Sequence, residues 1–393
     1  MLTNLPQQPA DALLALIKLH NADPRPTRID LGVGVYRTGQ GATPVFGAIK
    51  AAEQILVDTQ DSKAYLGPEG DMGFVHALMP TIFGQQSQPV AQGRIDGMQA
   101  PGGTGALRLA FAMAKRAGVK RFWMGTPSWP NHAQIFTDLG CELKTFAHDT
   151  PAGVADMAAL RAAIAAAQPD DAILLHGCCH NPTGIDYLPA EWDEIAQLVA
   201  DRGLLPILDL AYQGLGHGLE EDAYGIRRVL DAVPEALIAY SCDKNFGLYR
   251  DRVGAVYVMM AEAGQLPAAM SNGHALARAS WSQPPDHGAA AVRLVLADPA
   301  LTALWLDELD TMRVRMRQVR AELAAAGKVG GVDLTAIGQQ NGLFSIIPFT
   351  PAQVQAMRER HGIYFAGSGR INIAGLTLGN IDTFLAAVAD VTG

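Results

Sequence analysis

Three short apolar runs in the middle of the chain decide the fold: residues 171–179 read DAILLHGCC, residues 204–210 read LLPILDL, and residues 236–242 read ALIAYSC. Runs of this length and composition are typical of strands that are covered on both faces. Alanine-rich stretches with helical periodicity lie between and around them, among them 104–117 and Pro189–Arg202. This alternation predicts an α/β fold, with a mainly parallel central sheet and helices on both of its faces.

Outside this region the pattern predicts a fourth strand at 253–260, and then a long helix at 301–326. A helix of 26 residues is about 39 Å long, so we expect it to connect two lobes. A short alternating stretch near 343–347, a helix at Pro351–His361, and a last strand and helix after Gly369 complete the C-terminal part.

These elements predict three parts. We expect an N-terminal arm at residues 1–11, a small α/β domain built from both chain ends at 12–44 plus 309–393, and a large α/β domain at 45–308.

The composition excludes several classes of protein. Of 393 residues 49% are hydrophobic, so a large core is expected, and the net charge of −9 argues against a nucleic-acid or anionic-membrane partner. No apolar run approaches the roughly 18 residues that span a bilayer, and no secretory signal is seen. The four cysteines form neither a disulfide framework nor a zinc motif. We therefore expect a cytoplasmic protein without a metal site.

The strongest local signal is the heptapeptide SCDKNFG at residues 241–247, which ends an apolar run. A lysine directly after a buried strand is unusual, and a desolvated amine such as that of Lys244 can attack a carbonyl group. A surface lysine on a strand-exit loop is an equally good interpretation of this heptapeptide alone.

Three more polar residues follow predicted strands: Asn181 in HNPTG, and Asp209 and Tyr212 in DLAY. Individually they suit a turn, a helix cap and a core tyrosine. However, residues just past the carboxyl ends of parallel strands converge on one crevice, where ligands bind. We therefore expect all three to lie beside Lys244.

A fourth segment, GGTGAL at residues 102–107, opens a predicted helix. Free backbone N–H groups at a helix start bind phosphate well, although such a segment is more often only a turn. It matches neither the Walker A pattern nor the dinucleotide fingerprint.

Together these motifs resemble the class I, fold-type I, aminotransferases that depend on pyridoxal 5′-phosphate, in the aspartate and aromatic amino-acid branch. The resemblance covers nearly the whole chain. It includes IDLGVGVY at 29–36, KAYLG at 63–67, PSWPNH at 127–132, the HNPTG and DLAY segments, the heptapeptide, and GRINIAG at 369–375.

The resemblance implies a role for each residue around the cofactor ring. Lys244 would form the Schiff base and shuttle the substrate's proton, and Asp209 would pair with the pyridine nitrogen. Asn181 and Tyr212 would hydrogen-bond the 3′-oxygen. Three further residues would support this set: Trp129, stacked on the ring, His132, orienting Asp209, and His176, in the surrounding shell.

The resemblance also implies how the phosphate and the substrate are held. The phosphate would be bound by Gly103, Thr104, Ser241 and Arg252, and by Tyr65 of a neighbouring subunit, so a homodimer with shared sites is expected. For the substrate, the implied residues are Arg370 for the α-carboxylate, Arg278 across the dimer for a distal carboxylate, Gly34 beside the substrate, Phe344 lining the lid, and Trp129 and Asn181 again.

Several residues depart from the family pattern. Asp243 stands where serine is usual beside the lysine, and we expect its side chain to turn away from the phosphate. Ala64, Trp281 and Gln283 also differ, and the more apolar entrance they create would tolerate aromatic substrates, which argues against a strict preference for aspartate.

The predicted function is amino transfer between an aromatic or dicarboxylic L-amino acid, such as tyrosine, phenylalanine or aspartate, and 2-oxoglutarate, which yields a 2-oxo acid and L-glutamate. Two alternatives remain open: another reaction of the same cofactor, such as β-elimination or decarboxylation, and a non-catalytic ligand-binding regulator on the same fold.

Overall fold

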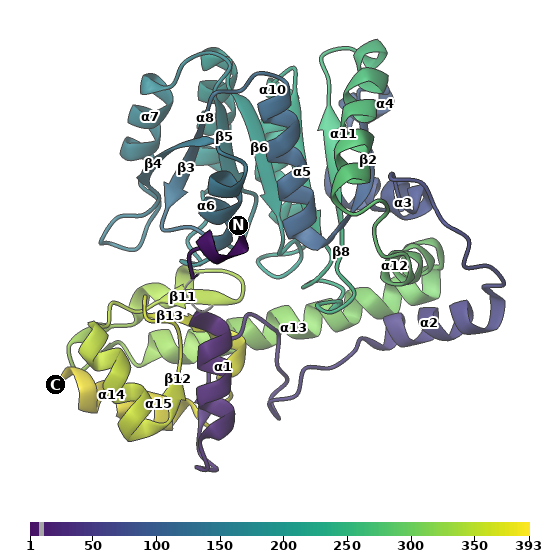
Figure 1. Cartoon of the computed structure of the whole chain (residues 1–393). Coiled ribbons are helices and arrows are strands. Elements are labelled where there is room, and N and C mark those ends of the chain that lie inside the picture. The colour runs from purple at the N-terminus through teal and green to yellow at the C-terminus, as the bar shows by residue number, and fades with distance from the viewer. Residues whose placement is uncertain (8–11) are drawn as a thin grey trace. The chain divides into compact units, whose positions relative to one another are not determined.

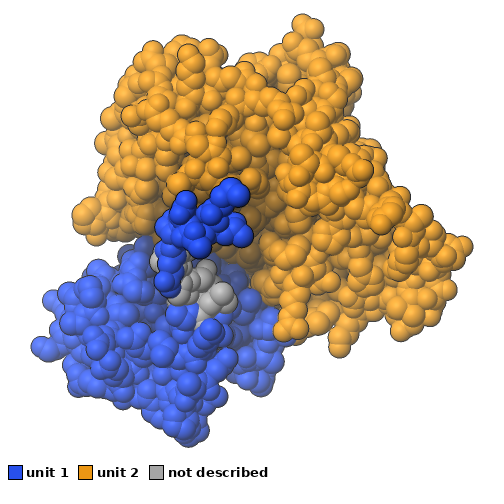
Figure 2. Space-filling model, viewed as in Figure 1, with its two compact units in different colours: residues 1–43, 315–393 blue, residues 44–314 orange. Residues whose placement is uncertain are grey.

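The computed structural model describes residues 1–7 and 12–393. The described chain divides into two compact units, residues 1–43 with 315–393 and residues 44–314, coloured separately in Figure 2. Of the predicted N-terminal arm, residues 8–11 lie outside the described residues, and Leu2–Asn4 form an exposed 3-10 helix.

The larger unit, residues 44–314, is built on a seven-stranded sheet with the order β2-β8-β7-β6-β5-β3-β4 (Figure 1). The strands are β2 (Ile95–Pro101), β3 (Arg121–Thr126), β4 (Glu142–Ala147), β5 (Ala172–His176), β6 (Leu205–Leu210), β7 (Ala236–Ser241) and β8 (Val253–Met259). Strands β4, β3, β5, β6 and β7 run parallel to one another, whereas β8 is antiparallel to both β7 and β2. The prediction of a mainly parallel α/β sheet is confirmed.

Helices cover both faces of this sheet, and as a result every residue of β7 and β8 is buried. Helix α5 (Gly102–Arg116) packs against β7 and β8, and Figure 1 shows it crossing in front of the sheet. The other helices that lie wholly in this unit are α2 (Gly47–Thr59), α3 (Met72–Phe83), α4 (Gln88–Ala91), α6 (Pro130–Asp138), α7 (Met157–Ala166), α8 (Pro189–Arg202), α9 (Leu219–Asp222), α10 (Tyr224–Ala232), α11 (Leu266–Ser280) and α12 (His287–Ala297).

Local sequence sets the ends of these elements. Helix α8 begins with a proline at its first position, Pro189, and ends at Gly203, which has a left-handed backbone with φ +70°. Helix α5 follows β2 directly through Gly102, where φ is +71°, so the chain turns sharply from strand to helix. This turn leaves the first N–H groups of α5 without helical acceptors.

The smaller unit, residues 1–43 and 315–393, joins the two chain ends through pairing of β1 (Ile29–Asp30) with β12 (Ile363–Tyr364). A second pair joins β11 (Phe344–Ile346) to β13 (Arg370–Asn372). The remaining elements are α1 (Ala12–Ala22), β9 (Lys328–Val329), β10 (Val332–Asp333), α14 (Pro351–His361), α15 (Ile381–Thr392), the 3-10 helices η3 (Thr335–Gln339) and η4 (Ile373–Gly375), and part of α13 (Pro299–Ala325).

Among the described residues, no single helix has the length and apolar character needed to cross a membrane. The bent pair of α12 and α13, whose axes differ by 104°, meets the length and composition test only when the two are combined.

Candidate active site

The neighbouring parallel strands β5, β6 and β7 have their carboxyl ends on the same side of the sheet, and the predicted polar residues follow the strands there. The Nδ2 amide of Asn181 donates to the hydroxyl of Tyr212 at 3.3 Å. The Nζ amine of Lys244 lies 5.7 Å from the centre of the Tyr212 ring. Residues that are 31 and 32 positions apart in sequence therefore share one site.

The Lys244 amine lies in a desolvated position, since its side chain is only 20% exposed. Burial lowers its pKa, and although the Asp243 carboxylate opposes this shift, the nearby Arg252 charge adds to it. A larger fraction of neutral amine is therefore available than on a surface lysine, as nucleophilic or basic chemistry requires.

A chain of hydrogen bonds leads from Asp209 into the protein. The Oδ2 atom of Asp209 is 2.9 Å from Nε2 of His132, and Nδ1 of His132 is 3.0 Å from the hydroxyl of Ser128. The same hydroxyl is 3.1 Å from Nε2 of His176. The chain orients the carboxylate, and three of its members were expected from sequence.

Burial controls the charge of the titratable side chains in and around these hydrogen bonds. It lowers the pKa of His176 to about 3 and that of His148 to about 4, so both imidazoles are neutral near pH 7. Burial also opposes ionisation of Asp209, but the hydrogen bond and charge of His132 outweigh it, and the Asp209 pKa falls below its usual value. Asp209 is thus an anion held ready for a cationic partner.

Ligand atoms of His132, His176 and Asp209 lie within 4.8 Å of one another, a spacing that a metal ion can also use. Each of the three side chains is already engaged in the hydrogen-bond chain just described. The arrangement therefore suits proton and charge positioning better than metal binding.

Strand β8 runs antiparallel to β7, so the residues that follow β7 and those that precede β8 lie together. This arrangement places two cations at the carboxyl ends of the parallel strands. Lys244 follows β7, whereas Arg252 precedes β8 and has a left-handed backbone with φ +57°. One edge of the Arg252 guanidinium faces Gly102, where a Cβ atom would lie 2.5 Å from Nη2. A parallel β8 would have put Arg252 at the opposite end of the sheet.

The start of α5 forms a cradle of suitable size and polarity for a phosphate. A Cβ atom at Gly103 would lie 3.0 Å from Cβ of Ser241, so glycine keeps the backbone open beside the serine. Thr104 is half-buried in the same turn. Helix N–H groups, a serine hydroxyl and Arg252 are the donors that a phosphate monoester prefers, so the predicted residues fit the predicted cofactor.

Asp243 does not turn away as expected. Its Oδ2 atom accepts from Nη1 of Arg252 at 2.5 Å and lies 3.8 Å from Nζ of Lys244. The carboxylate faces the predicted phosphate-binding arginine because that guanidinium offers a strong partner to a side chain that is only 4% exposed.

Other predicted residues lie apart from this cluster or at its margin. Trp129 packs edge-on against His132, with ring centres 5.1 Å apart. Tyr65 is 94% exposed, and Arg278 is exposed near the end of α11, where it hydrogen-bonds Ser282. Within the larger unit Tyr65 and Arg278 therefore do not contact Lys244, and their service to a neighbouring subunit stays a prediction.

In the smaller unit, the structure brings together the other three residues predicted for the substrate. The Arg370 guanidinium lies 4.4 Å from the Phe344 ring centre and donates to the carbonyl of Gly32 at 3.1 Å. A Cβ atom at Gly34 would lie 2.7 Å from Cζ of Phe344. Buried Arg320 holds the segment around Phe344 by donating to the carbonyls of Asn341, Gly342 and Phe344 and to the hydroxyl of Ser345.

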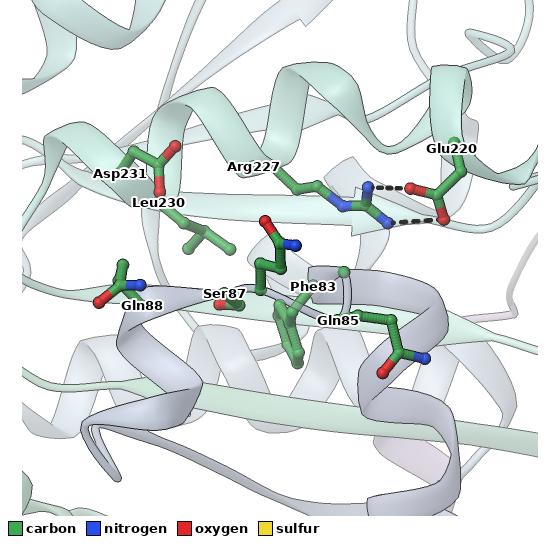
Figure 3. A pocket seen from close by; sticks show the side chains of 10 residues that line it. Phe83, Gln85, Ser87, Gln88, Glu220, Arg227, Leu230 and Asp231 are labelled. Atoms are coloured by element: carbon green, nitrogen blue, oxygen red, sulfur yellow. Dashed lines mark hydrogen bonds and ion pairs between the residues drawn. The ribbon is translucent and has the colours of Figure 1, made fainter.

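A separate pocket of about 530 Å³ lies between residues 83–88 and helices α9 and α10 (Figure 3). Its arginine, Arg227, already pairs with Glu220 and donates to the carbonyls of Thr81 and Ile82. None of the predicted site residues lines it, so it is not the predicted site.

Comparison with known proteins shows the family of this chain. The family model for aminotransferase class I and II matches residues 26–388. The chain belongs to this family. It is 49% identical over 377 residues to a tyrosine aminotransferase of Rhizobium meliloti (strain 1021), covering 96% of both chains. It is 42% identical over 395 residues to an aspartate aminotransferase of Escherichia coli (strain K12), covering 100% of both.

A solved aminotransferase supports the same assignment. The aromatic-amino-acid aminotransferase from Burkholderia pseudomallei, whose structure is covalently bound to pyridoxal phosphate, superposes with a TM-score of 0.96 at 34% identity over 100% of both chains.

The sequence analysis missed two side chains of this aminotransferase site. Ser128 joins His132 to His176, and His148 stacks on His180 with ring centres 3.5 Å apart. Ser128 lies inside the quoted PSWPNH motif, but it precedes helix α6, which begins at Pro130, so no helical spacing links it to His132 in the sequence. His148 carries no signal either, because it follows a different strand, β4.

Proposed function

We propose that this chain is an aminotransferase that uses pyridoxal 5′-phosphate. It moves the amino group of an aromatic or dicarboxylic L-amino acid, such as tyrosine, phenylalanine or aspartate, to 2-oxoglutarate, and it yields the 2-oxo acid and L-glutamate. The observation that carries the proposal is the desolvated Lys244 amine at the same sheet edge as Asp209, a carboxylate oriented by His132. Relatives named for tyrosine, aspartate and aromatic substrates support the substrate range.

When bound, the cofactor supplies a protonated ring that accepts the electrons of the substrate's Cα–H bond. Asp209 would hold the proton on the ring nitrogen, because its negative charge favours the protonated ring. Lys244 would take the Cα proton on Nζ in its neutral form and return it as a general acid. Asn181 and Tyr212, already joined by a hydrogen bond, would bind the 3′-oxygen, and Trp129 would lie against the ring.

The phosphate anchors this cofactor at the start of α5. Gly103 and Thr104 provide backbone N–H groups, Ser241 its hydroxyl and Arg252 its guanidinium. Tyr65 of a second subunit completes the set in a homodimer, which the 94% exposure of this side chain supports.

The substrate is recognised through its charges. Arg370 binds the α-carboxylate beside Gly34 and Phe344, and Arg278 of the second subunit binds a distal carboxylate. We also propose that the enzyme works in the cytoplasm, which its four free cysteines support, and that residues 12–44 with 309–393 form the small domain and 45–308 the large one.

The assignment of Lys244 is tested by adding pyridoxal 5′-phosphate to the purified protein. The wild type is expected to develop a near-visible absorption band that changes with pH. Lys244→Ala is expected to lose this band and at least about 10³-fold of the amino-transfer rate, because both the nucleophile and the base are removed. Lys50→Ala, a surface lysine of α2, is the matched control. Near-normal turnover by Lys244→Ala would refute the proposal.

The role of Arg278 is tested by comparing two substrates on one preparation. Arg278→Leu is expected to reduce kcat/KM for aspartate by about 100-fold and that for phenylalanine by less than tenfold, since only aspartate loses a charge partner. Equal losses for both substrates would show that Arg278 does not select the distal carboxylate.

A further inference from the structure

Trp305 lies on helix α13, in the part that belongs to the larger unit, and it contacts the turn that carries Lys244. It is 1% exposed, and its indole Nε1 donates to the backbone carbonyl of Asn245 at 2.7 Å. Its ring also stacks on that of Phe246, with ring centres 4.4 Å apart and planes 5° from parallel. One side chain therefore holds both of the residues that directly follow Lys244 in sequence.

Further contacts close the turn around Lys244. The side-chain amide of Asn245, which is buried, donates to the hydroxyl of Tyr240 at 2.8 Å. The backbone N–H of Phe246 donates to the carbonyl of Cys242 at 3.3 Å. Because a lysine amine is carried on a long and flexible stem, its place in the site depends on how firmly this backbone is held.

The same face of α13 contacts the neighbouring turn of the site. Trp305, Leu309 and Arg313 follow one another at intervals of four residues, so they share one side of the helix. Nη1 of Arg313 donates to the carbonyl of Gly214 at 3.1 Å, and a Cβ atom at Gly214 would lie 2.5 Å from Cδ2 of Leu309. Gly214 is two residues beyond Tyr212. One side of this helix thus contacts the turns after β6 and β7, whose side chains meet in the site.

We propose that Trp305 is a positioning residue for Lys244: its N–H group and its ring hold the turn so that the amine stays desolvated beside Tyr212. The inference rests on the proposed function, because it takes Lys244 to be the reacting amine. The buried indole acts through the turn and contacts neither substrate nor cofactor. The charged and titratable groups around the amine are those of Asp243, Arg252, Asp209 and Tyr212.

The first test follows the Lys244 amine in the cofactor-free chain, through its acetylation by acetic anhydride at a series of pH values, read by mass spectrometry. Burial lowers the pKa of Lys244, so its labelling midpoint should lie below that of Lys50, a surface lysine in the same sample. Trp305→Phe keeps an aromatic ring against Phe246 but removes the N–H donor. It should raise the Lys244 midpoint by about 0.5 pH unit or more, because a loosened turn lets water reach the amine. An unchanged midpoint overturns the proposal.

The matched control is Trp192→Phe. Trp192 is a buried tryptophan of α8, 4% exposed, whose aromatic neighbour is Tyr187. This variant should leave the Lys244 midpoint unchanged, and a shift equal to that of Trp305→Phe overturns the proposal. If Trp305→Phe fails to fold, Phe246→Leu takes its place, since it removes the stacked ring and keeps the indole hydrogen bond. A smaller shift in the same direction is then expected, and no shift overturns the proposal.

A second test separates positioning from a general loosening of the fold. In the holoenzyme Trp305→Phe should lower kcat about tenfold and leave KM for the amino donor within about twofold, because a displaced base slows proton transfer more than it weakens binding. In the Lys244→Ala background, with methylamine supplied as the base, Trp305→Phe should cause no further loss. An equal loss there overturns the proposal. The proposed function fails separately, through absence of the near-visible band, and the acetylation result does not depend on it.

Discussion

Two buried carboxylates flank Lys244, and they are held in different ways. Asp209 is oriented by His132 through a chain of Ser128 and neutral His176, whereas Asp243 is paired with the permanently charged Arg252. An imidazole can orient an anion without fully cancelling its charge, so Asp209 stays available to a new cation. The Arg252 guanidinium does cancel the charge of its carboxylate, so Asp243 attracts a further cation only weakly. The partner, more than the burial, decides which carboxylate can serve the chemistry.

The largest effect that separates the two carboxylates is expected from Asp209→Asn. The amide keeps the size of the side chain but cannot hold a proton on the ring nitrogen, so kcat should fall about 10³-fold, or about 4 kcal/mol. Single-turnover rates with saturating cofactor measure this loss. Asp209→Glu, which keeps the charge, should lose less. If the asparagine variant stays within tenfold of the wild type, Asp209 and Asp243 do not differ as argued.

The buried His176 should also make the stability of the fold depend on acid pH. The pKa of His176 is about 3 in the folded chain against about 6.5 when unfolded, so the unfolded state binds more protons between these values. Stability should therefore fall as the pH drops below 6.5, by about 1.4 kcal/mol per unit for His176 alone. Any contribution from Asp209, whose folded pKa is lowered, is lost only at lower pH, below about 4.

Urea unfolding of the cofactor-free chain at pH 7, 6 and 5 measures this slope. His176→Gln should reduce it by about 1.4 kcal/mol per pH unit. His76→Gln removes an exposed imidazole instead and serves as the control. The same slope in His176→Gln and wild type would show that this histidine does not stay neutral in the fold.

A smaller effect is expected from Ser128→Ala. The hydroxyl lies between Nδ1 of His132 and Nε2 of His176, so its loss removes two hydrogen bonds, worth about 1 kcal/mol each. Because His132 would still contact Asp209, kcat should fall only about five- to tenfold. A pH–rate profile should shift together with kcat, and a loss of thermal stability with unchanged kcat would assign Ser128 a purely structural role.

Much of the site follows from local sequence. The apolar runs at 204–210, which contains Asp209, and at 236–242, which precedes Lys244, predicted both strands. Parallel neighbours have their carboxyl ends on the same side, so the runs also predicted that these residues lie together. The long helix and the small-unit strand carrying Phe344 were also predicted, and they appear as α13 and β11.

What could not be predicted depends on contacts between segments. The reversed direction of β8 has no local signature, although it is what brings Arg252 next to Asp243. The outward turn was expected for Asp243 because a carboxylate near the phosphate should weaken cofactor binding, and its pairing with Arg252 shows that this expectation is wrong. The link from His132 through Ser128 to His176 likewise arises only when β5 and the start of α6 come together.

Buried Arg320 has a consequence for selectivity at a distance. Its guanidinium donates hydrogen bonds to the carbonyls of Asn341, Gly342 and Phe344. The Phe344 ring in turn lies against Arg370. Phe344, which lies beside the arginine proposed to bind the substrate carboxylate, is thus supported by a buried side chain that is not itself proposed to contact the substrate. Substitution of Arg320 could therefore change which amino acids are accepted, even though every residue that contacts the substrate stays the same.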